Sequence, residues 1–292
     1  MTHPVLVSYL ERAALAGIDA PIRTDGEGRV VGRFVNATLT SAFQPVREVG
    51  SGRIAAFEGF VRSHARGAAT SAADHDAGLS PWKVLDRAAD DTESIVLDRL
   101  CRVLHATNFF RQPQSAGHDL YLSVDARLLS GVGSNHGMAF LNILRQLELP
   151  QGQIVLQLPL VPNDQGWLLN YVSDNYRRNG FRLAARAADL RHALRLLDHV
   201  RPDVIKLDGR LALSTGEALG LLTEAAQRAV KPVFTRVDSV EVANALGELV
   251  QRAGLAVFAQ GFLWDRPHAS LAVASARHAA YATTAQELLE RV

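Results

Sequence analysis

The chain has 292 residues, of which 48% are hydrophobic, and its 31 basic residues nearly balance its 30 acidic ones, for a formal net charge of +1. This length suits one large α/β barrel or two ordinary domains. The balanced charge excludes a general electrostatic attraction to nucleic acid or to anionic membranes, so a phosphate-bearing ligand would need a local site.

The sequence contains one cysteine, Cys101, which excludes an intramolecular disulfide and fits a reducing compartment. Cys101 lies in a helical pattern, where we expect a buried structural thiol and not a nucleophile. No apolar run reaches the ~20 residues of a membrane-spanning helix, and the first residues lack the pattern of a signal peptide. We therefore expect a soluble cytoplasmic protein.

The first residues predict a short extension ahead of the main body. Residues 5–17 form an amphipathic pattern that ends at Gly17, which is typical of a helix with a glycine cap. Residues 22–40 combine three glycines with a strand-like segment and indicate a small hairpin packed on the main body. We place the extension at residues 1–38 and a single larger domain at residues 39–292.

Two strands are predicted around the turn Gly50-Ser51-Gly52. Because side chains alternate along a strand, Glu58, Phe60 and Arg62 point to one side of the second strand. A loop-like stretch of small residues follows at 65–78. Helical patterns then begin at Ser80, where a proline follows a capping residue, and near residue 90.

From residue 120 onward, apolar strand-like segments alternate with helical patterns such as 168–179 and 214–229. Near-continuous apolar strands separated by helices indicate a parallel sheet covered on both faces. With the two strands around Gly50, the total is eight, which predicts a TIM-like (β/α)8 barrel. A doubly wound sheet is the alternative, since strand number alone does not close a barrel. The six later strands are expected at 120–126, 154–160, 181–187, 204–209, 232–238 and 255–261.

Five short motifs occur in order along the chain. They are Phe43-Gln44-Pro45-Val46, Phe57-Glu58-Gly59-Phe60-Val61-Arg62, Ser80-Pro81 with Asp86-Arg87-Ala88-Ala89, Val204-Ile205-Lys206-Leu207-Asp208, and Ala259-Gln260-Gly261-Phe262-Leu263 followed by Arg266-Pro267. Together they resemble the EAL domain, a barrel family that in its active form hydrolyses the bacterial second messenger cyclic di-GMP. The resemblance covers residues 40–270. Gly59 and Phe60 replace the alanine and leucine of the family's Glu-Ala-Leu signature.

In active members of that family, two divalent cations activate a water and stabilise the displacement at phosphorus. Such cations prefer oxygen ligands, chiefly carboxylates, and barrel enzymes place them at the C-terminal ends of the strands. The resemblance implies that four catalytic remnants are retained here, namely Glu58, Asp125, Lys206 and Asp208. It places the family's metal positions at Glu58, Asp125, Gln157, Arg186, Ala187 and Thr235, with Ser123 in place of Asp125 if the strand slips by two residues.

Most of these positions no longer carry a carboxylate. Gln157 is neutral and a poorer metal ligand than glutamate. Arg186 brings a fixed positive charge that repels an entering cation. We therefore expect that the metal site is lost, that no cofactor is bound and that cyclic di-GMP is not hydrolysed.

The retained residues also have purely structural interpretations. Glu58 could form a buried ion pair with Arg62, or with Arg186 in the space that a metal would occupy. Lys206 lies in an apolar strand and needs a partner, which Asp208 could supply from the same face of that strand.

Three functions follow from the resemblance. The favoured one is a catalytically inactive EAL-type domain that acts as a regulatory module in cyclic di-GMP-linked bacterial signalling, by contacts with an unknown regulatory protein. The first alternative is a metal-independent cyclic di-GMP receptor, because arginines can hold phosphates in bidentate fashion. An active phosphodiesterase is the last alternative. Candidate ligand-binding residues are Gln44, Glu58, Phe60, Arg62, Arg186, Arg236 and Gln260.

The sequence leaves the assembly open. A last helix at 285–292 has one apolar stripe and could pack on the barrel or on a second subunit, so a homodimer is possible. The ~40 residues before the barrel are too few for a cyclase or sensor domain. We expect a standalone module that does not contact nucleic acid directly.

Overall fold

The computed structural model describes residues 22–34, 36–65, 91–126, 136–160 and 166–272. The helices predicted at 5–17, from Ser80 and at 285–292 lie outside these ranges, as does nearly all of the loop predicted at 65–78. The motif from Ser80 to Ala89 is likewise outside the described residues.

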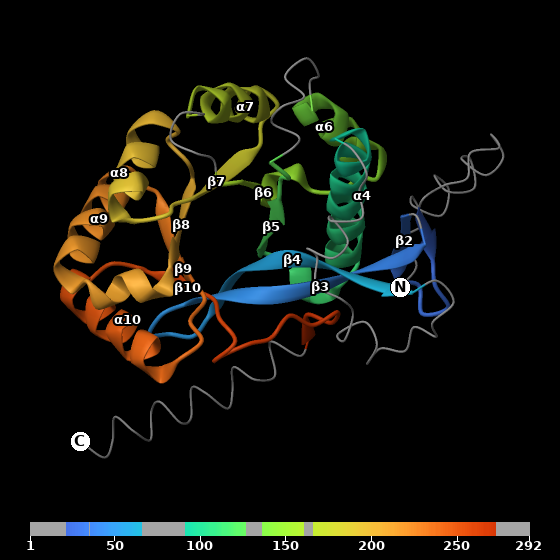
Figure 1. Cartoon of the computed structure of the whole chain (residues 1–292). Coiled ribbons are helices and arrows are strands. Elements are labelled where there is room, and N and C mark those ends of the chain that lie inside the picture. The colour runs from blue at the N-terminus through green and yellow to red at the C-terminus, as the bar shows by residue number, and fades with distance from the viewer. Residues whose placement is uncertain (1–21, 35, 66–90, 127–135, 161–165, 273–292) are drawn as a thin grey trace.

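Eight strands close into a barrel (Figure 1). The sheet order runs from β3 through β10 and β9 down to β4, and β3 pairs with β4 to close the ring. Neighbouring strands from β4 to β10 are parallel, whereas β3 is antiparallel to both of its neighbours. The predicted TIM-like barrel is therefore confirmed, and the doubly wound alternative is wrong because the sheet closes. The barrel strands are β3 (Ala37–Glu48), β4 (Ile54–Ala65), β5 (Asp119–Ser123), β6 (Ile154–Leu158), β7 (Arg182–Arg186), β8 (Val204–Asp208), β9 (Lys231–Thr235) and β10 (Phe258–Ala259).

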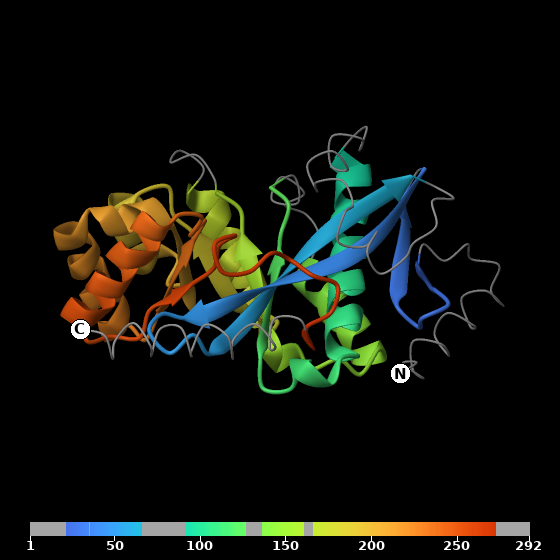
Figure 2. The same cartoon turned by 90° about the horizontal axis from the view of Figure 1, so that it is seen from below.

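The two longest strands extend beyond the barrel and carry the N-terminal hairpin (Figure 2). Gly50 and Gly52 have φ angles of +95° and +66°, which glycine adopts without steric cost, and they turn β3 into β4. At the other end, β1 (Ile22–Thr24) pairs with β2 (Val30–Phe34), and β2 pairs with β3. The hairpin expected in residues 22–40 is thus confirmed as an antiparallel extension of the sheet.

Helices cover the outside of the barrel (Figure 1). Their ends follow local capping rules: Asp189 accepts a hydrogen bond from the amide of His192, Ser239 accepts one from that of Val242, and Gly254 ends its helix in a left-handed conformation. No helix in the described ranges has the length and hydropathy needed to cross a lipid bilayer. The helices are α4 (Asp91–Phe110), α6 (His136–Gln146), α7 (Gly166–Arg178), α8 (Leu190–His199), α9 (Thr215–Gln227) and α10 (Val240–Ala253), with short 3₁₀ turns η1 (Pro113–Ser115), η2 (Gln151–Gln153) and η4 (Gly209–Leu213).

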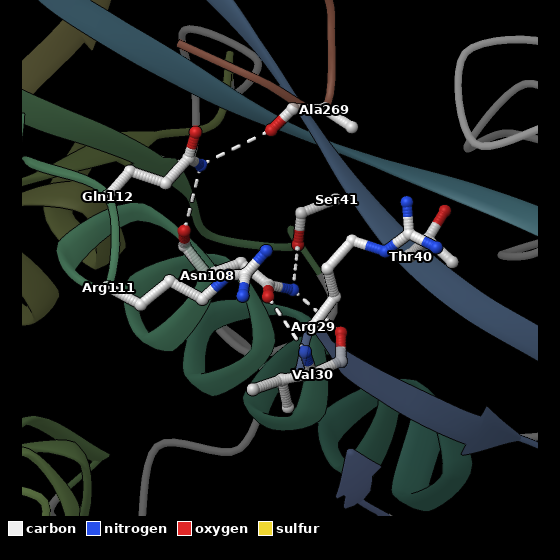
Figure 3. Close-up of a pocket in the computed structure, with 8 residues that line it drawn as sticks. All are labelled: Arg29, Val30, Thr40, Ser41, Asn108, Arg111, Gln112 and Ala269. Atoms are coloured by element: carbon white, nitrogen blue, oxygen red, sulfur yellow. Dashed lines mark hydrogen bonds between the residues drawn. The ribbon is translucent and has the colours of Figure 1, made fainter. Parts of the chain in front are cut away.

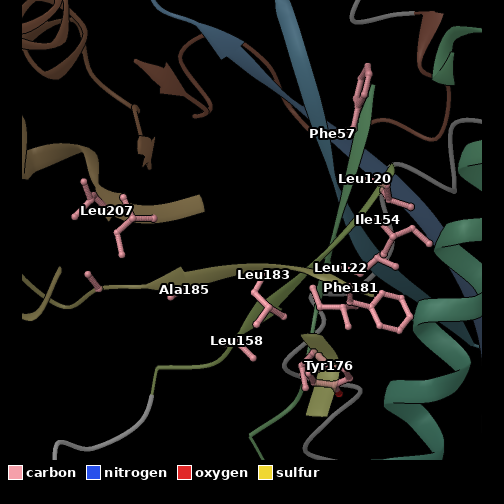
Figure 4. Close-up of a cluster of buried hydrophobic side chains, with 14 of the residues drawn as sticks. Phe57, Leu120, Leu122, Ile154, Leu158, Tyr176, Phe181, Leu183, Ala185 and Leu207 are labelled. Atoms are coloured by element: carbon pink, nitrogen blue, oxygen red, sulfur yellow. The ribbon is translucent and has the colours of Figure 1, made fainter. Parts of the chain in front are cut away.

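Alternating side chains divide the core into an outer and an inner part. Outward-facing residues such as Leu120, Leu122 and Leu183 pack under the helices, as Figure 4 shows. Inward-facing residues form a separate apolar layer near the start of the parallel strands, made of Val46, Ala56, Tyr121, Val155, Ala184, Val204, Val233 and Phe258. The next inward position on each strand, two residues on, therefore lies nearer the carboxyl ends of the parallel strands.

Candidate functional site

A buried polar layer lies directly above this inner apolar layer. It is formed by Glu58 on β4, Gln157 on β6, Lys206 on β8, Gln260 just after β10, and Gln44 on β3. Each is two residues from an inner-layer residue of the same strand, so the pleat directs it into the barrel. All five side chains are buried, with Lys206 only 1% exposed and Glu58 only 3%.

The ammonium of Lys206 is at the centre of this layer. It donates to Glu58 Oε2 at 2.7 Å, to Gln157 Oε1 at 2.6 Å and to Gln260 Oε1 at 3.2 Å. It also lies 5.4 Å from the centre of the Tyr121 ring, which forms the floor beneath it. All three ammonium protons thus have acceptors, which is the condition under which a buried lysine is tolerated.

Glu58 is satisfied from the other side of the same network. Its Oε1 accepts from Gln157 Nε2 at 2.7 Å, and its Oε2 accepts from Gln260 Nε2 at 2.6 Å as well as from Lys206. Burial alone would raise the pKa of the Glu58 carboxyl, but the Lys206 ammonium and the amide hydrogen bonds outweigh burial and hold that pKa below its ordinary value. Burial lowers the pKa of Lys206, Glu58 opposes this, and Arg186 on the adjacent strand adds to the lowering. The layer therefore contains a buried ion pair bridged by two amides.

The network continues from the barrel interior to the segment that follows β10. Gln260 Nε2 also donates to Gln44 Oε1 at 3.2 Å, and Gln44 Nε2 donates to the backbone carbonyl of Asp265 at 2.7 Å. The Asp265 carboxylate in turn receives two hydrogen bonds from Arg47 on β3, at 2.6 and 2.9 Å, and both side chains are buried. Sequence analysis missed this pair, because its members are 218 residues apart and no local pattern connects them.

The ion-pair partners of the site differ from those suggested by the sequence. Glu58 pairs with Lys206 and not with Arg62 or Arg186, because Lys206 reaches it across the barrel interior. Asp208 does not partner Lys206: it accepts from the backbone and guanidinium of Arg210 and from Arg236, which both lie at the open end of the barrel.

The other predicted site residues lie at the rim, above the buried layer. Arg186 is exposed and is the cross-strand neighbour of Lys206, whereas Ala187 is buried. Thr235 is half-buried, and its hydroxyl donates to the carbonyl of Leu207 at 2.9 Å. Phe60 and Arg62 are half-buried on the part of β4 that rises beyond the layer.

Ser123, and not Asp125, is the β5 residue beside Gln157. The two are register partners on adjacent strands, and Gln157 Nε2 lies 3.3 Å from Ser123 Oγ. Asp125 is two residues beyond the end of β5, where its backbone amide donates to Asp98 Oδ1 at 2.9 Å. The two-residue shift considered for this strand is the register in which Ser123 lies against the buried layer.

Gly59, which departs from the Glu-Ala-Leu signature, has a local structural reason. A Cβ atom at this position would lie 3.2 Å from the ring of His105 on α4, closer than ordinary packing allows. The His105 Nδ1 lies 2.8 Å from the hydroxyl of Ser41, and burial, with a contribution from Arg62, lowers the pKa of His105 to about 3. A neutral imidazole thus takes the space above Gly59.

The donor atoms of this site do not suit a pair of divalent cations. Both carboxylate oxygens of Glu58 accept hydrogen bonds from the chain itself, and the neighbouring positions offer an amide, a hydroxyl and a guanidinium. Across the described ranges, no group of three or more His, Cys, Asp and Glu side chains is placed to hold a metal. Two cations close together require several carboxylates to balance their charge.

A small pocket lies elsewhere, between the hairpin, α4 and the segment after β10 (Figure 3). Asn108 fills its centre, where its amide bonds the backbone of Val30 on both sides and the hydroxyl of Ser41. Gln112 donates to the carbonyls of Asn108 and Ala269. The amides are therefore used to join the hairpin to the barrel, and we do not regard this pocket as the functional site.

The fold is shared with several solved structures. BlrP1 from Klebsiella pneumoniae, in a manganese and cyclic di-GMP complex at pH 9.0, aligns with a TM-score of 0.64 and 19% identity over 79% of this chain and 56% of that one. The same protein with FMN and cyclic di-GMP but no metal ions aligns at 0.57 and 18%, over 79% and 53%. A standalone EAL protein from Vibrio cholerae O395, bound to cyclic di-GMP, aligns at 0.59 and 17%, over 80% and 94%.

These alignments differ in how much of each protein they cover. The chain spans little more than half of BlrP1, but nearly all of the Vibrio protein. A search of curated proteins finds no match. The EAL domain family matches residues 30–267, which is most of the sequence and includes every strand of the barrel. The chain therefore belongs to the EAL domain family.

Proposed function

We propose that this chain is a non-hydrolysing EAL domain that acts in cyclic di-GMP-linked bacterial signalling through contacts with a regulatory protein. In this proposal the barrel keeps the family fold but not its metal-dependent reaction. Its place of action is the bacterial cytoplasm, where the messenger and its regulators are found.

The observation that supports loss of hydrolysis is the occupation of Glu58. This buried carboxylate is neutralised by Lys206 and has both oxygens engaged by donors of the chain. Freeing it for a cation would leave the ammonium without its ion-pair partner in a buried site, which is costly. Arg186 at the adjacent strand end adds a second positive charge that an entering cation would meet.

Hydrolysis is tested by incubating the purified chain with cyclic di-GMP and either Mn²⁺ or Mg²⁺ and separating the products by chromatography. We expect no linear dinucleotide above the level of a metal-free control. An intact EAL phosphodiesterase under the same conditions verifies the assay. Turnover at a rate comparable to that enzyme would overturn the proposal.

A metal-independent receptor for cyclic di-GMP is the second candidate, and the rim supports it. Arg186 is exposed and makes no ion pair with any residue in the described ranges, so its guanidinium is available to a phosphate. The metal-free BlrP1 complex indicates that in that protein the nucleotide is held without metal ions.

Calorimetric titration with cyclic di-GMP in EDTA separates the two candidates. Micromolar binding that is lost in Arg62→Ala and Arg186→Ala, but kept in Arg228→Ala on the distant end of α9, would favour the receptor. No heat at high nucleotide concentration would leave protein contacts as the function of the domain.

A further inference from the structure

The outer face of α7 carries an unusual set of exposed side chains. Trp167 is 65% exposed and Tyr171 is 50% exposed, the two largest aromatic surfaces on any helix in the described ranges. Asp174 and Arg178 continue the same face toward the end of the helix and are also exposed. Figure 1 places α7 on the periphery of the barrel, between α6 and α8.

These four residues form one narrow stripe. Helical residues are separated by about 100°, so positions 167, 171, 174 and 178 fall within roughly 60° of one another. The opposite side of the helix is apolar and buried against the barrel through Leu168, Leu169, Val172 and Tyr176. The stripe is therefore directed straight outward, and we call it the α7 stripe.

The charged end of the stripe is not used within the chain. Asp174 and Arg178 are four residues apart, the spacing at which helical side chains often pair, yet neither forms an ion pair with any residue of the described ranges. Arg177, the next residue along, is instead turned inward to the carbonyls of Val200 and Arg201. The chain thus leaves one acidic and one basic group exposed beside two aromatic rings.

The order of the stripe makes it complementary to itself when two copies run antiparallel. Trp167 then faces Arg178 of the other copy, and Tyr171 faces Asp174 of the other copy. Both pairs are centred on the same point, between residues 172 and 173, so one two-fold axis generates all four contacts. Each pair has a favourable chemistry: a guanidinium over an indole ring, and a phenol hydroxyl donating to a carboxylate.

From this self-complementarity, we propose that the α7 stripe is a two-fold contact with a second copy of this chain. The contact goes beyond the proposed function, since it requires neither cyclic di-GMP nor a regulatory partner. An isologous contact of this kind closes after two subunits, which gives a dimer and not a filament.

The size of the contact predicts a weak dimer. The two aromatic side chains of each copy would bury roughly 100 Å² apiece, about 400 Å² for the pair of helices. A stable interface buries about 1,200–2,000 Å² in total, so flanking groups must contribute. Met138 on α6 and Leu194 on α8 are exposed on the helices to either side and are the nearest candidates. We expect a dissociation constant in the micromolar range or weaker.

Sedimentation velocity over a concentration series measures this association. We expect the weight-average mass to rise from monomer toward dimer as concentration increases, with and without cyclic di-GMP. Trp167→Ala should weaken dimerisation by about tenfold or more. Phe262→Ala removes a similarly exposed aromatic side chain far from α7 and should leave the association unchanged.

Cysteine cross-linking tests the antiparallel register itself, in a Cys101→Ser background. Mixing a Trp167→Cys chain with an Arg178→Cys chain under oxidising conditions should give a covalent heterodimer. Trp167→Cys mixed with Asp174→Cys should give little, because those positions are not opposite each other. A chain that stays monomeric to sub-millimolar concentration, or a dimer that cross-links equally in both mixtures, would overturn the inference.

Discussion

Replacing Lys206 with methionine tests whether the ion pair is the structural centre of the barrel. Methionine keeps most of the lysine volume but removes the ammonium that lies 2.7 Å from Glu58. Glu58 would then be a carboxylate that is 3% exposed, with only the amides of Gln157 and Gln260 to stabilise it. Removing one partner of such a pair costs about 3–5 kcal/mol of unfolding free energy, and the two remaining hydrogen bonds favour the lower end.

Urea unfolding of the wild type, Lys206→Met and the double variant Lys206→Met with Glu58→Gln measures this cost. The double variant removes both charges and should recover at least half of the lost stability, because no unpaired charge stays buried. Such a recovery would show that the cost comes from the orphaned carboxylate and not from altered packing.

The pH dependence supplies an independent sign test. In the wild type the pKa of Glu58 is lowered, so its contribution is present above the ordinary value of 4.5 and is lost as pH falls through the folded pKa. In Lys206→Met the pKa of Glu58 should rise above 4.5, so protonation relieves the penalty. The stability gap between wild type and variant should therefore narrow from pH 7 to pH 4. A gap below about 1 kcal/mol at pH 7, or one that widens in acid, would refute the reasoning.

Three further outcomes follow from the packing and the donor set. Gly261→Ala should cost more than about 3 kcal/mol, because its Cβ would lie 2.0 Å from the backbone oxygen of Val237, whereas Gly247→Ala on open α10 surface should gain about 0.5–1 kcal/mol in thermal unfolding. Gly59→Ala should cost about 1–2 kcal/mol, and adding His105→Ala should recover part of it in a double-mutant cycle; strict additivity would contradict the contact. Mn²⁺ added to EDTA-treated protein should change the unfolding temperature by less than about 1 °C, and a rise of several degrees would indicate a metal site.

The strand pattern was sufficient to predict the barrel, because each parallel strand is a short apolar run followed by a helix. It also placed Glu58 and Lys206 on inward faces, since side-chain alternation depends only on position along the strand. The same alternation could not settle Ser123 against Asp125, which both lie on the inward face. A slip of two residues leaves every side chain on its original side, and only the pairing of β5 with β6 fixes the choice.

Partners across the barrel were beyond the reach of the sequence. Asp208 shares a face with Lys206, but residues two apart on a strand are about 6.6 Å from each other along it, so Asp208 lies one layer nearer to solvent. Arg210 and Arg236 are closer to it there. Lys206 instead finds Glu58, which is 148 residues away in sequence but on the same level of the closed sheet. Barrel closure therefore decides the pairing, and local chemistry does not.

Gln157 explains how such a barrel can keep its interior without metal ions. Its amide is both donor and acceptor: Nε2 donates to Glu58 and Oε1 accepts from Lys206, so it bridges the two charges and completes both. A glutamate in its place would put two carboxylates in hydrogen-bonding distance with one ammonium between them, leaving a net negative charge in a buried site. Such an excess is tolerated when cations balance it and is costly otherwise. The neutral amide at position 157 and the loss of metal-dependent hydrolysis that we propose are therefore consistent: with Gln157 the layer is electrically balanced by the chain alone.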